Sequence, residues 1–70
     1  MKGSEFLRKV KKAAKKNGWS FEWHPDIGKG SHGMLVVNGK VTILRNLADE
    51  LKTGTFHGML KQLELKEQDL

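Results

Sequence analysis

Residues 31–44 decide the fold, and they read SHGMLVVNGKVTIL. The dipeptide Asn38-Gly39 divides this stretch into two apolar segments. It favours the two-residue turn of a β-hairpin, because both central positions of that turn need a positive φ. The sequence therefore predicts strands over 31–37 and 40–44. A two-residue turn sets Val37 opposite Lys40, and the remaining opposed pairs follow from it.

Opposed residues of a hairpin share one face of the sheet, so the register predicts which side chains lie together. The more apolar face, which we predict to be the core, carries Met34, Val36, Val41 and Ile43. His32 and Arg45 have the same parity, but they lie at the far end of the ladder. A polar site could open there, where the cover of the helices ends. A slip of one residue would move every side chain to the opposite face.

The flanking segments predict one more strand and two helices. Aromatic and polar residues alternate over 19–23, which is typical of a half-buried strand. Apolar residues recur at helical spacing over 4–17, where Ser4 is the expected N-cap and Gly18 the expected left-handed end. A second helix is predicted over 54–63 from the apolar repeat Phe56, Met59, Leu60 and Leu63. We expect the polar tail, 64–70, to fray.

The resulting order is α-β-β-β-α, which belongs to the α+β class. A three-stranded antiparallel sheet with both helices packed on one face is the economical way to bury these apolar stripes. At 70 residues the chain makes one domain, 1–70, with a small core. That size excludes a multidomain enzyme and a large substrate cavity.

Charge is distributed unevenly along the chain. Residues 1–40 hold nine basic and three acidic side chains, whereas 41–70 hold four basic and five acidic ones. A strongly positive half indicates a polyanionic partner, above all nucleic acid, although a lysine-rich face can also serve only solubility.

The absence of cysteine excludes disulfides and thiolate chemistry, and the longest apolar run, 34–37, is too short to span a membrane. We expect a cytoplasmic protein.

The tetrapeptide Lys29-Gly30-Ser31-His32 is the most informative motif. Histidine has an unperturbed pKa of about 6.5, which suits proton transfer near neutral pH. RNA carries its own nucleophile, the 2′-hydroxyl, so its cleavage needs an acid, a base and positive charge but no metal or other cofactor. We therefore predict His32 as a general acid or base. Lys29 and Arg45 would hold the scissile phosphate, while Ser31 and the Gly30 amide would position it.

Other residues are assigned weaker roles. Lys12 belongs to the lysine-rich face of the first helix, which could contact RNA phosphates. His24 and His57 are expected to be surface or packing residues, since the spacing of the three histidines matches no metal-site pattern. From these residues alone, the more common interpretation of the 29–32 segment is a tight loop that leads a histidine into a strand.

Four segments together resemble the HicA family of small toxin ribonucleases from toxin–antitoxin pairs. They are Lys2-Gly3-Ser4-Glu5-Phe6, Asn17-Gly18-Trp19, Lys29-Gly30-Ser31-His32, and the run from Glu50 to Thr55 followed by Met59 to Leu63. Each is weakly specific alone, whereas their order and spacing over about residues 2–65 are fairly specific.

The resemblance implies a fold like that of double-stranded-RNA-binding domains, cleavage of mRNA that arrests translation, and inhibition by a HicB-type antitoxin. It maps the catalytic histidine of the family onto His32. The chain departs from the family pattern at Gly33, where many members carry a second histidine. It also departs at 44–47, which lacks the histidine or proline common after the third strand, and in a longer loop between the first two strands. These departures leave a second acid or base unassigned.

Two other functions fit the same residues. A non-catalytic RNA-binding module of this topology would bind RNA with a steep salt dependence and never cleave it. A protein-interaction domain would use its basic face to bind an acidic partner, and binding of an antitoxin could coexist with nuclease activity. Alone, the chain is expected to be a monomer or a small oligomer, and with an antitoxin a hetero-oligomer.

Overall fold

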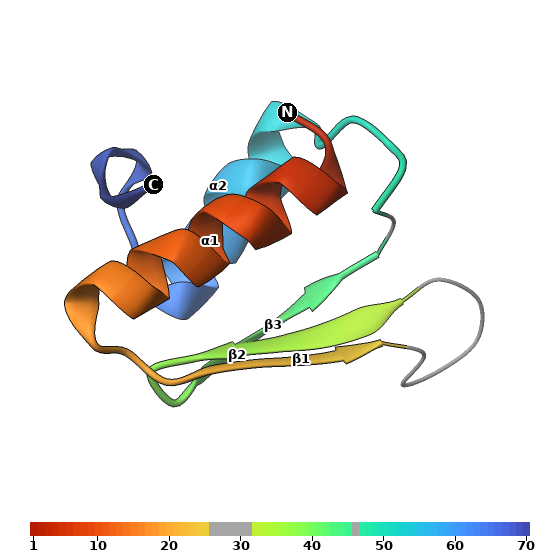
Figure 1. The fold of residues 1–70 in the computed structure, drawn as a ribbon. Coiled ribbons are helices and arrows are strands. Elements are labelled where there is room, and N and C mark those ends of the chain that lie inside the picture. Colours follow the sequence, from red (N-terminus) through yellow and green to blue (C-terminus); the bar gives the residue numbers. More distant parts are fainter. Residues whose placement is uncertain (26–31, 46) are drawn as a thin grey trace.

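The computed structural model describes residues 1–25, 32–45 and 47–70. It has the predicted order, with helix α1 (Gly3–Asn17), strands β1 (Phe21–Pro25), β2 (Gly33–Val37) and β3 (Lys40–Leu44), and helix α2 (Thr53–Leu63), as Figure 1 shows. A short 3₁₀ helix, η1 (Glu67–Asp69), follows. Both long helices lie on the same side of the sheet, which confirms the predicted α+β layout.

The sheet is antiparallel in the order β1-β2-β3, so β2 is its central strand. The hairpin register is the predicted one, since Val37 pairs with Lys40 and Met34 pairs with Ile43. Asn38 and Gly39 have φ values of 51° and 80°, as the two-residue turn requires. On the other side, β1 pairs Phe21 with Val37.

The prediction of the core face is wrong. Leu35, Val37 and Leu44 are fully buried, whereas Val41 is 48% exposed and Ile43 is 43% exposed. The apolar face of Met34, Val36, Val41 and Ile43 is therefore the face turned away from the helices. The true core face looks less apolar in sequence because it includes Gly33 and Thr42. It also receives Phe21 and Trp23 from β1, which pair with Val37 and Leu35.

Thr42 is tolerated in the core because its hydroxyl is satisfied. Its side chain is 2% exposed, and its Oγ1 donates a hydrogen bond to Oε1 of Gln62 on α2. A buried hydroxyl without a partner would destabilise the fold, so this bond is what allows a polar residue on the core face. It also joins β3 to α2.

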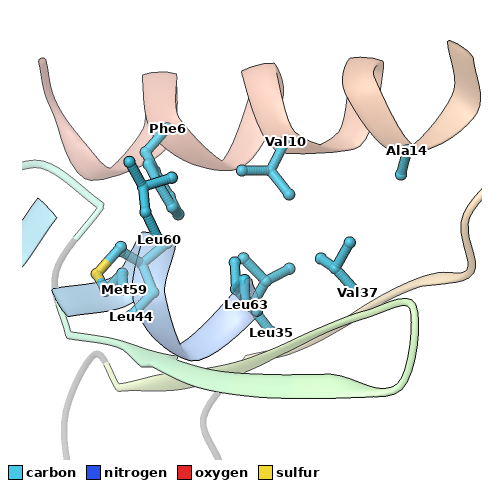
Figure 2. Close-up of a cluster of buried hydrophobic side chains, with 9 residues drawn as sticks. All are labelled: Phe6, Val10, Ala14, Leu35, Val37, Leu44, Met59, Leu60 and Leu63. Carbon is cyan, nitrogen blue, oxygen red and sulfur yellow. The ribbon is translucent and has the colours of Figure 1, made fainter. Parts of the chain in front are cut away.

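A single cluster of side chains fills the space between the helices and the sheet, as Figure 2 shows. α1 contributes a large residue at one end and a small one at the other, Phe6 and Ala14, with Val10 between them. The ring of Phe6 also meets that of Phe56 edge-on, with centroids 5.9 Å apart. The remaining members are Leu35, Val37, Leu44, Met59, Leu60 and Leu63.

α1 does not begin with the predicted Ser4 cap. Its N-cap is Lys2, which makes no side-chain capping bond. The free amides of the first turn are satisfied by backbone carbonyls instead, because Gly3 N donates to Asp49 O at 3.1 Å and Ser4 N to Leu47 O at 2.9 Å. The segment after β3 therefore fixes the start of α1. Its end is as predicted, with Gly18 in the left-handed conformation.

Other boundaries also differ from those predicted. β1 lies two residues later than 19–23 and includes His24 and Pro25. β2 begins at Gly33, so His32 precedes the strand, while residue 31 lies outside the described residues. The tail, predicted to fray, forms η1, and Leu65 and Leu70 pack against the core. Within the described ranges, none of the helices is long and apolar enough to cross a membrane.

The assignment of the two sheet faces can be tested with neighbouring residues of β3. We expect Leu44→Ala to lower the free energy of unfolding by about 2–5 kcal/mol, because it leaves a cavity in the core. Ile43→Ala removes a side chain from the solvent-facing side and should cost less than about 1 kcal/mol. Urea unfolding followed by tryptophan fluorescence measures both values.

The milder pair Leu44→Val and Ile43→Val serves if Leu44→Ala is too unstable to measure. Equal losses at the two positions would contradict the assignment of faces.

Candidate functional site

His32 leaves the sheet at the end of the β2–β3 ladder. The last pair of that ladder is Gly33 with Leu44, so His32 and Arg45 are the next residues at the same end. Both side chains are exposed. An imidazole in contact with water can exchange protons and meet a large substrate, as the predicted role of His32 requires.

Gly33 fixes the backbone next to His32. The residue is buried, and a Cβ placed on it would lie 2.2 Å from Cη2 of the Trp23 indole. Only glycine leaves room for that ring, which lies against the first residue of β2. The histidine common in the HicA family at this position would therefore clash here. The cause of this departure is not visible in the sequence, because Trp23 and Gly33 meet only once β1 is paired with β2.

Arg45 lies between β3 and α2, where two shallow hollows open. One, of about 350 Å³, is lined by Ile43, Arg45, Thr55, Gly58, Met59 and Gln62. The other, of about 240 Å³, also includes Arg45 and continues along 49–52. Arg45 already has a partner within the protein.

The structure does not bring all the predicted residues together. Lys29, Gly30 and Ser31 lie outside the described residues. Lys12 is exposed on α1, in the helical layer, whereas His32 lies at an end of the sheet. Among the described residues, the predicted catalytic group consists of His32 and Arg45, and Lys12 belongs to a separate surface.

The separate surface is the basic face of α1, which we define as Arg8, Lys9, Lys11, Lys12, Lys15 and Lys16. Every residue from 8 to 16 that is not a member of it is buried, namely Val10, Ala13 and Ala14. Of its members, Lys9 makes an ion pair with Glu5 at 3.6 Å. Lys9, Lys12 and Lys16 line a hollow of about 320 Å³ against the chain segment 68–70.

The other two histidines have carboxylate partners at the surface. His24 Nε2 lies 3.0 Å from Glu22 Oε1, and His57 Nε2 lies 3.4 Å from Glu67 Oε1. His24 is on the solvent-facing side of β1, and His57 is on α2. Over the described ranges, no three histidine, aspartate or glutamate side chains come together as a metal site.

Comparison of the chain with models of protein families, with curated proteins and with solved structures finds no match. The likeness to HicA toxins therefore stays a resemblance carried by the four sequence segments, and the argument for function depends on the residues themselves.

The contact between Gly33 and Trp23 predicts a position-specific loss of stability. We expect Gly33→Ala to lower the free energy of unfolding by about 1–3 kcal/mol, because the methyl group overlaps the indole ring. A control is Gly58→Ala on α2, where an added Cβ meets nothing within 4 Å. That change should stabilise the protein by about 0.5–1 kcal/mol, since alanine favours a helix more than glycine does.

Thermal unfolding measures both variants. The smaller side chain in Trp23→Leu should restore part of the loss in the Gly33→Ala background. If Gly33→Ala unfolds at the same temperature as the unmodified chain, the indole does not confine this position.

Proposed function

We propose that the chain is a ribonuclease toxin of the HicA type, which cleaves mRNA with His32 as general acid or base and without a metal ion. The observation that carries the proposal is the exposed imidazole of His32 at the entrance of a buried strand, directly after Lys29-Gly30-Ser31. Binding alone would not need an imidazole there.

The chemistry follows from the nucleophile within RNA. The 2′-hydroxyl oxygen attacks the adjacent phosphorus, the bond from phosphorus to the 5′-oxygen breaks, and a 2′,3′-cyclic phosphate remains on the upstream product. Neutral His32 would take the proton of the 2′-hydroxyl, or protonated His32 would give one to the departing 5′-oxygen. Acid–base assistance of this kind contributes typically 10²–10⁴-fold to a rate. Water or Lys29 would supply the second proton transfer, because one imidazole does not perform both at once.

Positive charge near the phosphorus would stabilise the charge that develops during attack. In this proposal Lys29 and Arg45 hold the phosphate, while the Ser31 hydroxyl and the Gly30 amide orient it. The role of Arg45 is supported by the pairing of β2 with β3, because the last pair, Gly33 with Leu44, is followed by His32 on one strand and Arg45 on the other. The support for Lys29, Gly30 and Ser31 is their position in the sequence before His32.

A toxin of this kind requires control, and the resemblance supplies the proposed partner, a HicB-type antitoxin. The cytoplasm, where mRNA is translated, is the proposed location. The alternative is an RNA-binding module of the same topology without catalytic activity.

The proposal is tested by replacing each histidine in turn. We expect His32→Ala to abolish cleavage of mRNA in the presence of EDTA and to abolish growth arrest when the chain is expressed in cells. The fold should persist, because the side chain is exposed. His24→Ala and His57→Ala remove imidazoles that are also exposed, and both variants should retain cleavage within a few-fold.

Gel analysis of RNA ends, with detection of the cyclic phosphate, measures the outcome, and circular dichroism checks the fold. Undiminished cleavage by His32→Ala in EDTA would refute the mechanism. RNA binding without cleavage by the unmodified chain, at any protein concentration, would favour the non-catalytic module.

A further inference from the structure

The net positive charge of the molecule is concentrated on one helix, whose basic face carries six of the thirteen basic side chains. The six members of the basic face of α1 exceed the formal net charge of +5 for the whole chain. The seven basic side chains elsewhere are outnumbered by the eight acidic side chains of the chain. A polyanion that approaches the protein is therefore attracted to α1 as its largest cluster of cations.

The basic face runs along α1, which begins beside residues 47 and 49, near the end of the sheet that carries His32, and ends towards the opposite end of β2 (Figure 1). α1 ends at Asn17, and the chain then leads into β1, where Ser20 O accepts a hydrogen bond from Asn38 N at the β2–β3 turn. His32 precedes the other end of β2 (Figure 1). Val37 lies five positions after His32, so β2 places the C-terminal end of the basic face roughly 17 Å from His32 along the strand, at about 3.4 Å per residue. A ligand that contacts both His32 and that end of the basic face must be extended.

The composition of the basic face favours RNA over a protein. No apolar side chain is exposed between residues 8 and 16, because Val10, Ala13 and Ala14 are all buried. Protein interfaces depend on buried apolar and aromatic anchors, which this face does not offer. The same lack excludes insertion into a membrane surface. Long cationic side chains without apolar neighbours suit a phosphate backbone, which is recognised by charge alone.

We infer that the basic face of α1 is a phosphate-binding surface for the substrate RNA that extends away from His32, so that binding and cleavage improve with RNA length until the strand reaches from His32 to the C-terminal end of that face. The inference rests on the proposed function for the identity of the RNA as substrate. Stacked nucleotides rise about 3.4 Å each along a strand, so about five of them span the estimated 17 Å. Shorter RNA bound at His32 would not reach Lys15 and Lys16 at the C-terminal end of the basic face.

The binding test uses fluorescent oligouridylates of 3 to 20 nucleotides with 2′-O-methyl groups, which cannot be cleaved through the 2′-hydroxyl. The variant is Lys12→Gln with Lys15→Gln, since neither lysine makes an ion pair within the part of the chain that the structure describes. Its control, Lys61→Gln with Lys66→Gln, removes the same charge elsewhere. Glutamine and lysine have similar helix propensities, so stability should change little.

We expect the α1 variant to lose most of the gain in affinity with length and the control to keep it. The slope of log K against log salt for the 20-nucleotide strand should fall by about 1.4 in the α1 variant, at about 0.7 per lost contact. Equal weakening by both variants, or an equal loss for 3 and 20 nucleotides, would overturn the inference. Binding of poly-glutamate as tight as that of RNA, and equally sensitive to the α1 variant, would overturn it in favour of an acidic protein.

A cleavage test with unmodified RNA separates this inference from the proposed function. The α1 variant should lower kcat/KM for 20-nucleotide RNA by a larger factor than kcat/KM for the shortest cleavable RNA. Length-dependent binding without any cleavage would refute the nuclease and leave the surface standing. Cleavage of all lengths at the unmodified rate by the α1 variant would refute the surface and leave the nuclease standing.

Discussion

The burial of one face of β2 is the constraint on which the rest of the structure depends. Gly33, Leu35 and Val37 alternate along this central strand, and all three are buried beneath the helices. Since both neighbouring strands pair with β2, its parity also sets the inward face of β1 and β3. Gly33 leaves room for the Trp23 ring only because it has no side chain. The position from which His32 leaves the sheet is therefore fixed by packing in the core.

Local patterns predicted the elements well and the core face badly. Asn38-Gly39 fixed the hairpin and its register because a turn of two residues has few alternatives. The choice of face failed because an apolar count does not reveal that Thr42 is satisfied by Gln62 or that Gly33 makes room for Trp23. Both compensations join residues from different elements, so they exist only in the folded chain. The start of α1 was missed for the same reason, since its amides are satisfied by residues 47 and 49.

In the candidate site, too, the local features were predicted from the sequence, whereas those that depend on contacts between elements were not. The sequence predicted an accessible His32 at the end of the ladder with Arg45 as its neighbour across the strands, and the described structure has both residues exposed where the ladder ends. It could not predict that Lys12 would lie away from His32, because the placement of α1 over the sheet depends on how Phe6, Val10 and Ala14 pack.

The size of the chain explains why binding and chemistry would occupy different places. A domain of 70 residues has too little interior to enclose a substrate, and the hollows beside Arg45 are shallow. Under the proposed function, affinity for RNA would come from long-range attraction of phosphates rather than from a deep pocket. A helix with a narrow buried stripe can present cations around most of its circumference, as α1 does. The end of the sheet would then have to place only one imidazole, which needs little surface.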